Sequence, residues 1–243
     1  MSTYSFLSKA GSRTVNEDRV GSSVLGEESL FAVADGLGGH WGGEIASGLA
    51  IACTEEIFQT VQERGLSEQL AVCFQYAQDK LLERQKEEGK PGEIKTTLVL
   101  FVQNQKQAVW GHIGDSRLYY FKKHRLKMRT YDHSVPQMLV DTGQLKETEI
   151  RNHPDRNRIL RVLGTPWEEP RYELSEPMPL KSGDRFLLCT DGFWELITEK
   201  QMTACLRKAN TPQQWLEQME EIVLETGKNR EMDNYSALSV WFT

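Results

Sequence analysis

The stretch Leu30-Phe-Ala-Val-Ala-Asp35-Gly-Leu-Gly-Gly-His-Trp-Gly-Gly-Glu44 organises the chain around it. Its first five residues are apolar, a run that is too short for an isolated helix and typical of a buried strand. Asp35 follows where this strand is expected to stop, so a rigid element would hold its carboxylate while leaving it open to solvent. The glycines after it permit a tight turn with uncovered backbone carbonyls. Carboxylate and carbonyl oxygens are the ligands that hard divalent cations prefer.

The same arrangement recurs along the chain. On its own, Asp-Gly most often marks an ordinary turn, so a single occurrence indicates little. However, Asp191-Gly192 ends another apolar run, Asp115 follows a third, and Asp233 stands just before the apolar segment 236–242. Aspartates at strand ends, spread over the whole length, predict carboxylates that converge on one site.

The composition is that of a soluble globular protein, with 39% hydrophobic and 26% charged residues. The length of 243 residues suffices for one large domain, and no repeat or linker divides residues 1–243. The net charge is −6 with no basic tract, which argues against a nucleic-acid partner. The acidic excess fits carboxylate ligands for cations, although solvated surface carboxylates explain such an excess equally well.

The lack of a recognisable targeting signal and the cysteine usage favour the cytoplasm. The first residues lack a basic region and a long apolar core, so no signal peptide is expected. No apolar run approaches the ~20 residues of a membrane span. The four cysteines, at positions 53, 73, 189 and 205, form no CxxC pair and are interpreted as core thiols in a reducing compartment rather than zinc ligands. We expect a cytoplasmic monomer with no membrane partner.

Apolar spacing predicts helices and strands in separate groups. Helical periodicity predicts helices over 44–63, 66–86, 198–208 and 211–226. Short apolar segments predict strands over 4–9, 20–25, 96–102, 107–113, 117–121, 159–163, 170–175, 184–190 and 236–242. Short turns join the three strands between 96 and 121, which predicts an antiparallel meander. Runs of strands with segregated helix pairs indicate an α+β domain with antiparallel sheets and helices outside them.

The segment 133–157 differs from the rest in being polar throughout. Short helices are expected within it at 137–142 and 147–152. The segment lacks a strong apolar face, so we expect it to have little core of its own and to be mobile.

Together these motifs resemble the metal-dependent serine/threonine protein phosphatases of the protein phosphatase 2C type, in their compact bacterial form. The resemblance covers essentially the whole chain, and the motifs occur in the order that the family uses. They are Arg13-x-x-Asn16-Glu17-Asp18, Asp35-Gly36-x-Gly38-Gly39-His40, Thr96-Thr97, Gly114-Asp115-Ser116-Arg117, Asp132-His133-Ser134, His153-Pro154-x-Arg156-Asn157, Thr190-Asp191-Gly192 and Asp233-Asn234. The resemblance implies two stacked antiparallel β-sheets flanked by pairs of antiparallel helices, a four-layer αββα sandwich in which residues 133–157 form a small flap.

The resemblance also implies a centre of two Mn²⁺ or Mg²⁺ ions. Asp35 would bridge both ions, the Gly36 carbonyl would bind one of them, and Asp191 and Asp233 would bind the other. Two such ions neutralise the phosphate charge and lower the pKa of a shared water from ~15.7 toward neutrality. The resulting hydroxide would attack phosphorus in line, without a covalent enzyme intermediate. Asp35 and Asp191 are therefore expected to be catalytic as well as metal-binding.

Further residues surround this implied centre. Glu17 and Asp18 would act through metal-bound waters, and Asp115 with Asp191 would hold a third, weaker ion. Arg13 would be catalytic by binding the substrate phosphate, because its planar guanidinium can make two parallel charge-assisted hydrogen bonds. A surface arginine beside Asp18 is the alternative interpretation of Arg13.

The identity of the general acid stays open at this stage. In animal relatives the usual candidate is a histidine two residues after the first metal aspartate, where this chain has Leu37. His40 is interpreted as a structural residue at the turn, and His133 and His153 as flap residues. We therefore expect no single histidine to be essential, since a metal-bound water could supply the proton instead.

The expected function is a metal-dependent phosphatase that acts on phosphoserine and phosphothreonine in phosphorylated proteins and opposes a bacterial serine/threonine kinase. A second interpretation is another two-metal hydrolase, such as a nuclease or a small-molecule phosphatase, and the missing basic surface argues against the nuclease. A third is a catalytically inactive scaffold that binds phosphoproteins. Such a scaffold would be expected to lose metal carboxylates, whereas Asp35, Asp191 and Asp233 are all present.

Overall fold

Two antiparallel β-sheets lie face to face in the computed structural model, which describes residues 2–38 and 42–243. The larger sheet contains β10 (Met178–Pro179), β6 (Gln107–Ile113), β5 (Leu98–Gln103), β3 (Glu28–Leu37) and β2 (Asp18–Leu25) in that order, with β4 (Lys95–Thr96) beside β3 and β9 (Glu173–Leu174) beside β6. The smaller sheet runs β1 (Ser2–Lys9), β12 (Tyr235–Phe242), β11 (Asp184–Cys189), β7 (Arg117–Lys122) and β8 (Arg125–Arg129).

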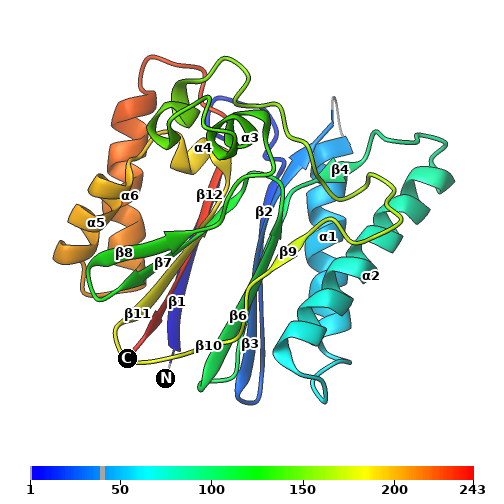
Figure 1. Cartoon of the computed structure of the whole chain (residues 1–243), viewed down its shortest axis with the longest axis horizontal. Coiled ribbons are helices and arrows are strands. Elements are labelled where there is room, and N and C mark those ends of the chain that lie inside the picture. The colour runs from blue at the N-terminus through cyan, green and yellow to red at the C-terminus, as the bar shows by residue number, and fades with distance from the viewer. Residues whose placement is uncertain (1, 39–41) are drawn as a thin grey trace.

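Helices cover the outer face of each sheet (Figure 1). On the larger sheet these are α1 (Gly42–Phe58) and α2 (Leu66–Glu87), and on the smaller sheet α5 (Glu199–Lys208) and α6 (Pro212–Gly227). Thr198 and Thr211 cap α5 and α6 by accepting hydrogen bonds from backbone amides of their first turns. The layer order is helices, sheet, sheet, helices, so the predicted four-layer αββα architecture is confirmed.

The side chains of β3 point alternately to two buried faces, which explains why its sequence is continuously apolar. Leu30, Ala32 and Ala34 pack in the core beneath α1 and α2. Phe31 and Val33 point the other way, into the core between the two sheets, where they join residues such as Phe186 and Leu238. Successive strand residues face opposite sides, so a strand that is buried on both faces needs apolar residues at every position.

The chain changes sheets after β6, which corrects the predicted meander. β5 and β6 are antiparallel neighbours, but β7 pairs with β11 and β8 in the other sheet. Gly114 permits the crossing, since its φ of +106° lies in the region that side chains disfavour. The crossing places the next residue, Asp115, between the two sheets.

Two predicted strands and one helix boundary were also wrong. Residues 159–163 form only two isolated bridges, from Ile159 to Ser134 and from Leu163 to Thr96 of β4, and Leu160 between them is 48% exposed. The predicted strand at 170–175 is reduced to β9, and the helix predicted over 44–63 ends at Phe58. Four short elements were missed: β4, β8, β10 and the helix α4 (Asp191–Trp194).

The polar segment 133–157 contains both of its predicted helices, as α3 (Val135–Asp141) and the 3₁₀ helix η1 (Glu147–Asn152). The expectation that it has little core of its own is confirmed, since one residue of the segment belongs to a buried apolar cluster. Ile150 is 2% exposed and belongs to the core beneath α5 and α6, with Val140 and Leu145 packed against it. One buried side chain from η1 and its neighbours therefore fixes this segment to the smaller sheet's helical layer.

Candidate metal centre

A pocket of about 300 Å³ is lined in part by Asp191, the first residue of α4. In Figure 1, α4 lies at the end of the sandwich opposite both termini. Seven of the eight site residues predicted from the sequence line the pocket, and Asp18 lies beneath it. The lining residues are Arg13, Glu17, Asp35, Gly36, Leu37, Gly38, Asp115, Asn157, Ile159, Asp191, Asp233 and Asn234. Asp18 and Asp35 stand directly opposite each other in the β2–β3 ladder. The structure therefore brings all eight residues together from five separate segments of the chain.

The backbone of Asp35 is fixed on both sides by threonines. Its amide donates to Oγ1 of Thr97 at 2.9 Å, and its carbonyl accepts from the Thr97 amide at 2.9 Å and from Oγ1 of Thr96 at 2.7 Å. β3 does not stop at Asp35, as the sequence predicted, but continues to Leu37 because Gly36 and Leu37 pair with β4. These bonds occupy the backbone and leave the carboxylate of Asp35 available to the pocket.

Close backbone approach explains the glycines that follow Asp35 and Asp191. A Cβ at Gly36 would lie 2.0 Å from the backbone oxygen of Gly43, and one at Gly192 would lie 2.0 Å from that of Asn234. Any side chain at either position would therefore push apart segments that form the pocket. The Asp-Gly pairs are required by packing here, which is a stronger constraint than an ordinary turn.

Two buried carboxylate oxygens lack a hydrogen-bond partner among the described residues. Asp18 accepts from the Thr190 hydroxyl at Oδ2, 2.8 Å away, but its Oδ1 has no partner. Asp115 is 2% exposed, and its Oδ1 is also without a partner. Leaving a buried charged oxygen unsatisfied is costly, so natural proteins rarely do so. An all-oxygen donor set with unsatisfied oxygens fits Mg²⁺ or Mn²⁺.

The carboxylates also repel one another. Burial raises the pKa of Asp18 to about 7, and the charges of Asp191 and Asp233 add to this effect, while hydrogen bonds from Ser236 and Thr190 oppose it. Burial and neighbouring carboxylates likewise raise the pKa values of Asp35, Asp115 and Asp191. Desolvation and like charge act in the same direction, toward the protonated form. A bound cation would reverse both effects.

The mouth of the pocket is more exposed. Nη2 of Arg13 lies 3.0 Å from Oδ2 of Asp233, and both side chains are about half exposed. Asn234 fixes the segment that carries them, because its amide group donates to the carbonyls of Ala10 and Val15 while its Oδ1 accepts from the Glu17 amide. Arg13 thus stands at the entrance with a guanidinium that can exchange Asp233 for another anion.

A second pocket of about 280 Å³ continues from this entrance. It shares Arg13, Asn157, Asp191 and Asp233 with the first, and its remaining lining includes Arg156, Arg230 and Glu195. Nε of Arg156 donates to Oε2 of Glu195 at 3.1 Å. Burial, and then the charge of Asp191, raise the pKa of Glu195 to about 7, while Arg156 lowers it.

The sequence interpretation missed Glu195. It is the C-cap residue of α4, and its spacing of four residues from the predicted metal ligand Asp191 was the available signal.

No described histidine lines the carboxylate pocket. His40 falls at 39–41, outside the described residues. His153 ends η1, where its Nδ1 accepts from the Asp155 amide. His133 is buried and stacks on His112, with ring centroids 4.6 Å apart and an interplanar angle of 13°. It lines a pocket that contains none of the predicted site residues.

His112, His133 and Glu173 are close enough to suggest another metal site, since one ligand atom from each lies within 4.8 Å of the others. The bonding argues against it. Nε2 of His112 is 2.7 Å from the Tyr131 carbonyl, and Nδ1 of His133 accepts from the Gly114 amide at 3.2 Å. That acceptor places the proton of neutral His133 on Nε2, which faces Glu173 at 3.2 Å. Parallel rings also direct their lone pairs side by side rather than toward one point.

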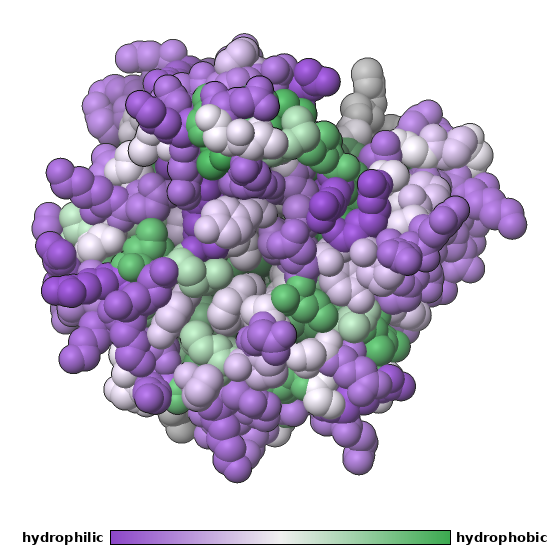
Figure 2. All heavy atoms as spheres, in the orientation of Figure 1, coloured by the Kyte–Doolittle hydropathy of each residue, from purple (hydrophilic) through white to green (hydrophobic). Residues whose placement is uncertain are grey.

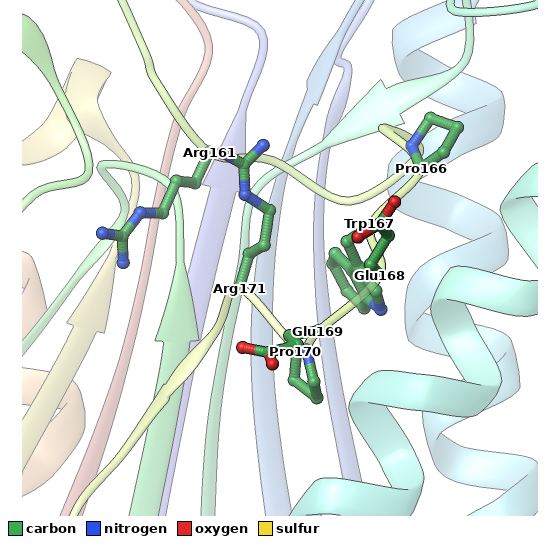
Figure 3. A pocket seen from close by; sticks show the side chains of 7 residues that line it. All are labelled: Arg161, Pro166, Trp167, Glu168, Glu169, Pro170 and Arg171. Carbon is green, nitrogen blue, oxygen red and sulfur yellow. The ribbon is translucent and has the colours of Figure 1, made fainter.

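A larger pocket elsewhere on the described part of the chain has no comparable carboxylate cluster. That pocket, of about 540 Å³, lies on the loop 161–171 and contains none of the predicted site residues. Figure 3 shows Arg161 and Arg171 on one side of it and Pro166 and Trp167 on the other. On the face seen in Figure 2, hydrophilic side chains cover the outer helices and apolar ones gather between them. The carboxylate pocket is therefore the candidate functional site.

The raised pKa values predict how the metal-free protein responds to pH. An acid whose pKa is higher in the folded state holds a proton that the unfolded state releases, so raising the pH destabilises the fold. Asp18 and Glu195, with pKa values of about 7, should make stability fall between about pH 6.5 and about pH 8, by on the order of 1 kcal/mol or more. Urea unfolding in EDTA, followed by tryptophan fluorescence, measures this change.

The measurement is confined to this pH range because, at lower pH, the histidines change the free energy of unfolding in the opposite direction to the carboxylates. Burial lowers the pKa of His112, and lowers that of His133 to about 4, so the unfolded state gains protons there only as the pH falls below about 6.5. Saturating Mn²⁺ is the control, since metal binding needs deprotonated carboxylates and should remove the loss. A metal-free stability that is flat or rises over this window would contradict the prediction.

Among the described residues, no helix is long and apolar enough to span a bilayer.

Comparison with known proteins points to one family. A family model described as Protein phosphatase 2C matches residues 8–234. Serine/threonine phosphatase stp from Listeria monocytogenes serotype 4b is 30% identical over 189 residues, which cover 76% of this chain and 74% of that protein. The crystal structure of the serine/threonine phosphatase PstP/Ppp from Mycobacterium tuberculosis has a TM-score of 0.86 at 28% identity, covering 99% of this chain and 98% of that one. The catalytic domain of PstP in complex with two manganese ions has a TM-score of 0.82 at 28% identity, covering 99% and 97%.

Proposed function

This chain belongs to the protein phosphatase 2C family, and we propose that it is a metal-dependent phosphatase acting on phosphoserine and phosphothreonine in proteins. The observation that carries the proposal is the carboxylate pocket. Carboxylates from distant segments meet there, and two of their buried oxygens lack any hydrogen-bond partner in the described chain. The relatives named as serine/threonine phosphatases support the same substrate class.

Asp35, Asp191 and Asp233, with the Gly36 carbonyl, would hold two Mn²⁺ or Mg²⁺ ions. Manganese in a solved relative supports this choice of ion. When bound, such ions neutralise the substrate phosphate and activate water for attack on phosphorus. The proposed role of the protein is to supply anionic ligands in a fixed arrangement, which the Thr96 and Thr97 bonds to the Asp35 backbone favour.

The remaining residues would place substrate and solvent. Glu17 and Asp18 would orient water around the ions, and Asp115 with Asp191 would hold a third, weaker ion. Arg13 at the pocket entrance would bind the phosphate in place of Asp233, with the fork of its guanidinium matching two phosphate oxygens. The pocket draws on residues from Arg13 to Asn234, which supports one catalytic domain over residues 1–243.

The biological setting we propose is the bacterial cytoplasm, where the enzyme would reverse the action of a serine/threonine kinase. The bacterial relatives support this setting. The substrate would be a protein segment that enters through the Arg156 and Arg230 pocket, since that pocket opens into the carboxylate site.

Phosphate release from a phosphothreonine peptide tests the proposal. We expect turnover with Mn²⁺ and loss of turnover, to the uncatalysed background, when EDTA removes the metal. A single-stranded DNA oligonucleotide, assayed alongside, distinguishes a nuclease, whereas turnover of a small phosphate ester alone would not separate the remaining two-metal hydrolases. Mn²⁺ binding without peptide turnover would instead favour the catalytically inactive scaffold.

A further inference from the structure

Trp194 connects two segments that carry carboxylates of the site. It is the last residue of α4, the short helix that begins with Asp191, and it is 2% exposed. Its indole Nε1 donates a hydrogen bond to the backbone carbonyl of Asp115 at 3.0 Å. One side chain therefore joins the segment of Asp115 to the helix of Asp191, although these residues lie far apart in the sequence.

The indole itself is held firmly. The guanidinium carbon of Arg117 lies 3.4 Å from the centroid of the ring, and Arg117 is fixed in turn by two hydrogen bonds to Asp132, at 2.7 and 2.6 Å. Arg151 of η1 lies 5.5 Å from the same centroid, and its Nε donates to the Trp194 carbonyl at 3.0 Å. The ring cannot move without disrupting buried charged groups.

Asp115 needs such an external support. It lies in the crossing between β6 and β7, outside both ladders, so no strand partner fixes its backbone. The preceding residue, Gly114, has a positive φ, and its carbonyl accepts from the His133 amide at 2.9 Å. The bond from Trp194 thus anchors the peptide group that immediately follows the Cα of Asp115.

We propose that Trp194 is a positioning residue that sets the separation of the Asp115 and Asp191 carboxylates and thereby determines how tightly the third, weakest Mn²⁺ or Mg²⁺ ion binds. This inference rests on the proposed function, because it takes these two aspartates as ligands of that ion. Outer-shell partners of metal ligands typically contribute 10–100-fold in affinity. Trp194 would act in this way through a backbone carbonyl.

Two substitutions test the N–H group of Trp194 separately from the size of its side chain. Trp194→Phe keeps an aromatic ring and removes the donor. Trp194→His loses bulk, but its Nε2–H can occupy the place of the indole N–H. Trp215 is the matched control, because it is fully buried and its Nε1 donates to the Met202 carbonyl at 2.9 Å, between α5 and α6.

Mn²⁺ calorimetry on the whole protein at about pH 8 is the main measurement, with thermal unfolding without metal beside it. We expect Trp194→Phe to weaken the weakest Mn²⁺ site by about 10-fold or more and to leave tighter sites unchanged. The Trp194→His variant should bind that ion more tightly than the Trp194→Phe variant does, although Trp194→His should unfold at a lower temperature. Trp215→Phe should lose stability but bind Mn²⁺ as the wild type does.

A Trp194→Phe isotherm that superimposes on the wild type would overturn the inference, as would equal weakening by Trp215→Phe. Asp115→Ala checks the premise, since it should remove the weakest site, and unchanged binding in this variant would also overturn the inference. Peptide turnover is recorded separately. Absent turnover with the expected binding pattern would reject the proposed function while supporting the role of Trp194.

Discussion

Replacing Asp191 by asparagine is expected to lower kcat for a phosphothreonine peptide at saturating Mn²⁺ by more than ~100-fold, the loss that even an outer-shell partner of a metal ligand can cause. The residue lines both connected pockets and lies at the first position of α4. An amide has the same shape but cannot supply the negative charge that divalent ions require. Phosphate release at increasing Mn²⁺ measures the effect and shows whether more metal restores it.

The same substitution should stabilise the metal-free protein. Burial, and then the charge of Asp233, raise the pKa of Asp191, so the folded state disfavours its carboxylate form at neutral pH. Removing that charge relieves repulsion, and Asp191→Asn should unfold at higher urea concentration than the wild type in EDTA. Residues that serve function at a cost in stability commonly show this trade-off.

Asp184, at the start of the strand β11 that leads to Asp191, provides the control. It is fully buried and accepts hydrogen bonds from Tyr120 at 2.9 Å and Lys122 at 2.6 Å. Asp184→Asn should therefore lose stability and keep the Mn²⁺ dependence of kcat. If Asp191→Asn is instead destabilised in EDTA as Asp184→Asn is, repulsion between the site carboxylates is not what governs its stability.

The sequence identified the site because its signals are local. Each signal is visible within ten residues, since Asp35, Asp115 and Asp191 follow an apolar run and Asp233 stands just before one. The helix pairs were predicted for a similar reason, since an amphipathic period is written in consecutive residues. The repetition of aspartates at strand ends predicted that the carboxylates converge, and the resemblance to a family then supplied the role of each aspartate.

Features that depend on distant partners were not predictable in this way. The sheet that β7 joins depends on its pairing with β11, some seventy residues later, and the spacing of short turns suggested a simple meander instead. Ile159 forms only an isolated bridge with Ser134, which lies outside the strands, so the predicted strand does not form there. Likewise, nothing near Trp194 in the sequence indicates that its indole reaches the carbonyl of Asp115.

Arg117→Met is expected to have the largest effect on stability, lowering the free energy of unfolding by about 3–5 kcal/mol. Arg117 and Asp132 are both about 1% exposed in their side chains and form a two-bonded pair. Burial alone would lower the pKa of the Arg117 guanidinium, but Asp132 and Tyr119 raise it well above its ordinary value. Removing the arginine leaves a buried carboxylate whose nearest remaining cation is Arg129, 3.8 Å away. Urea unfolding measures the loss.

A double-mutant cycle separates the stabilisation by the Arg117–Asp132 ion pair from the cost of leaving the Asp132 carboxylate buried without its partner. Arg117→Met with Asp132→Leu should be more stable than Arg117→Met alone, because a buried ion pair replaced by apolar groups often costs little. Arg64→Met is the exposed comparison, since the Arg64–Glu68 pair is about half exposed and should contribute less than ~1 kcal/mol. If Arg117→Met lowers the free energy of unfolding as little as Arg64→Met does, the Arg117–Asp132 pair does not hold the crossing between β6 and β7 in place. The support that Trp194 receives from Arg117 would then have to come from packing alone.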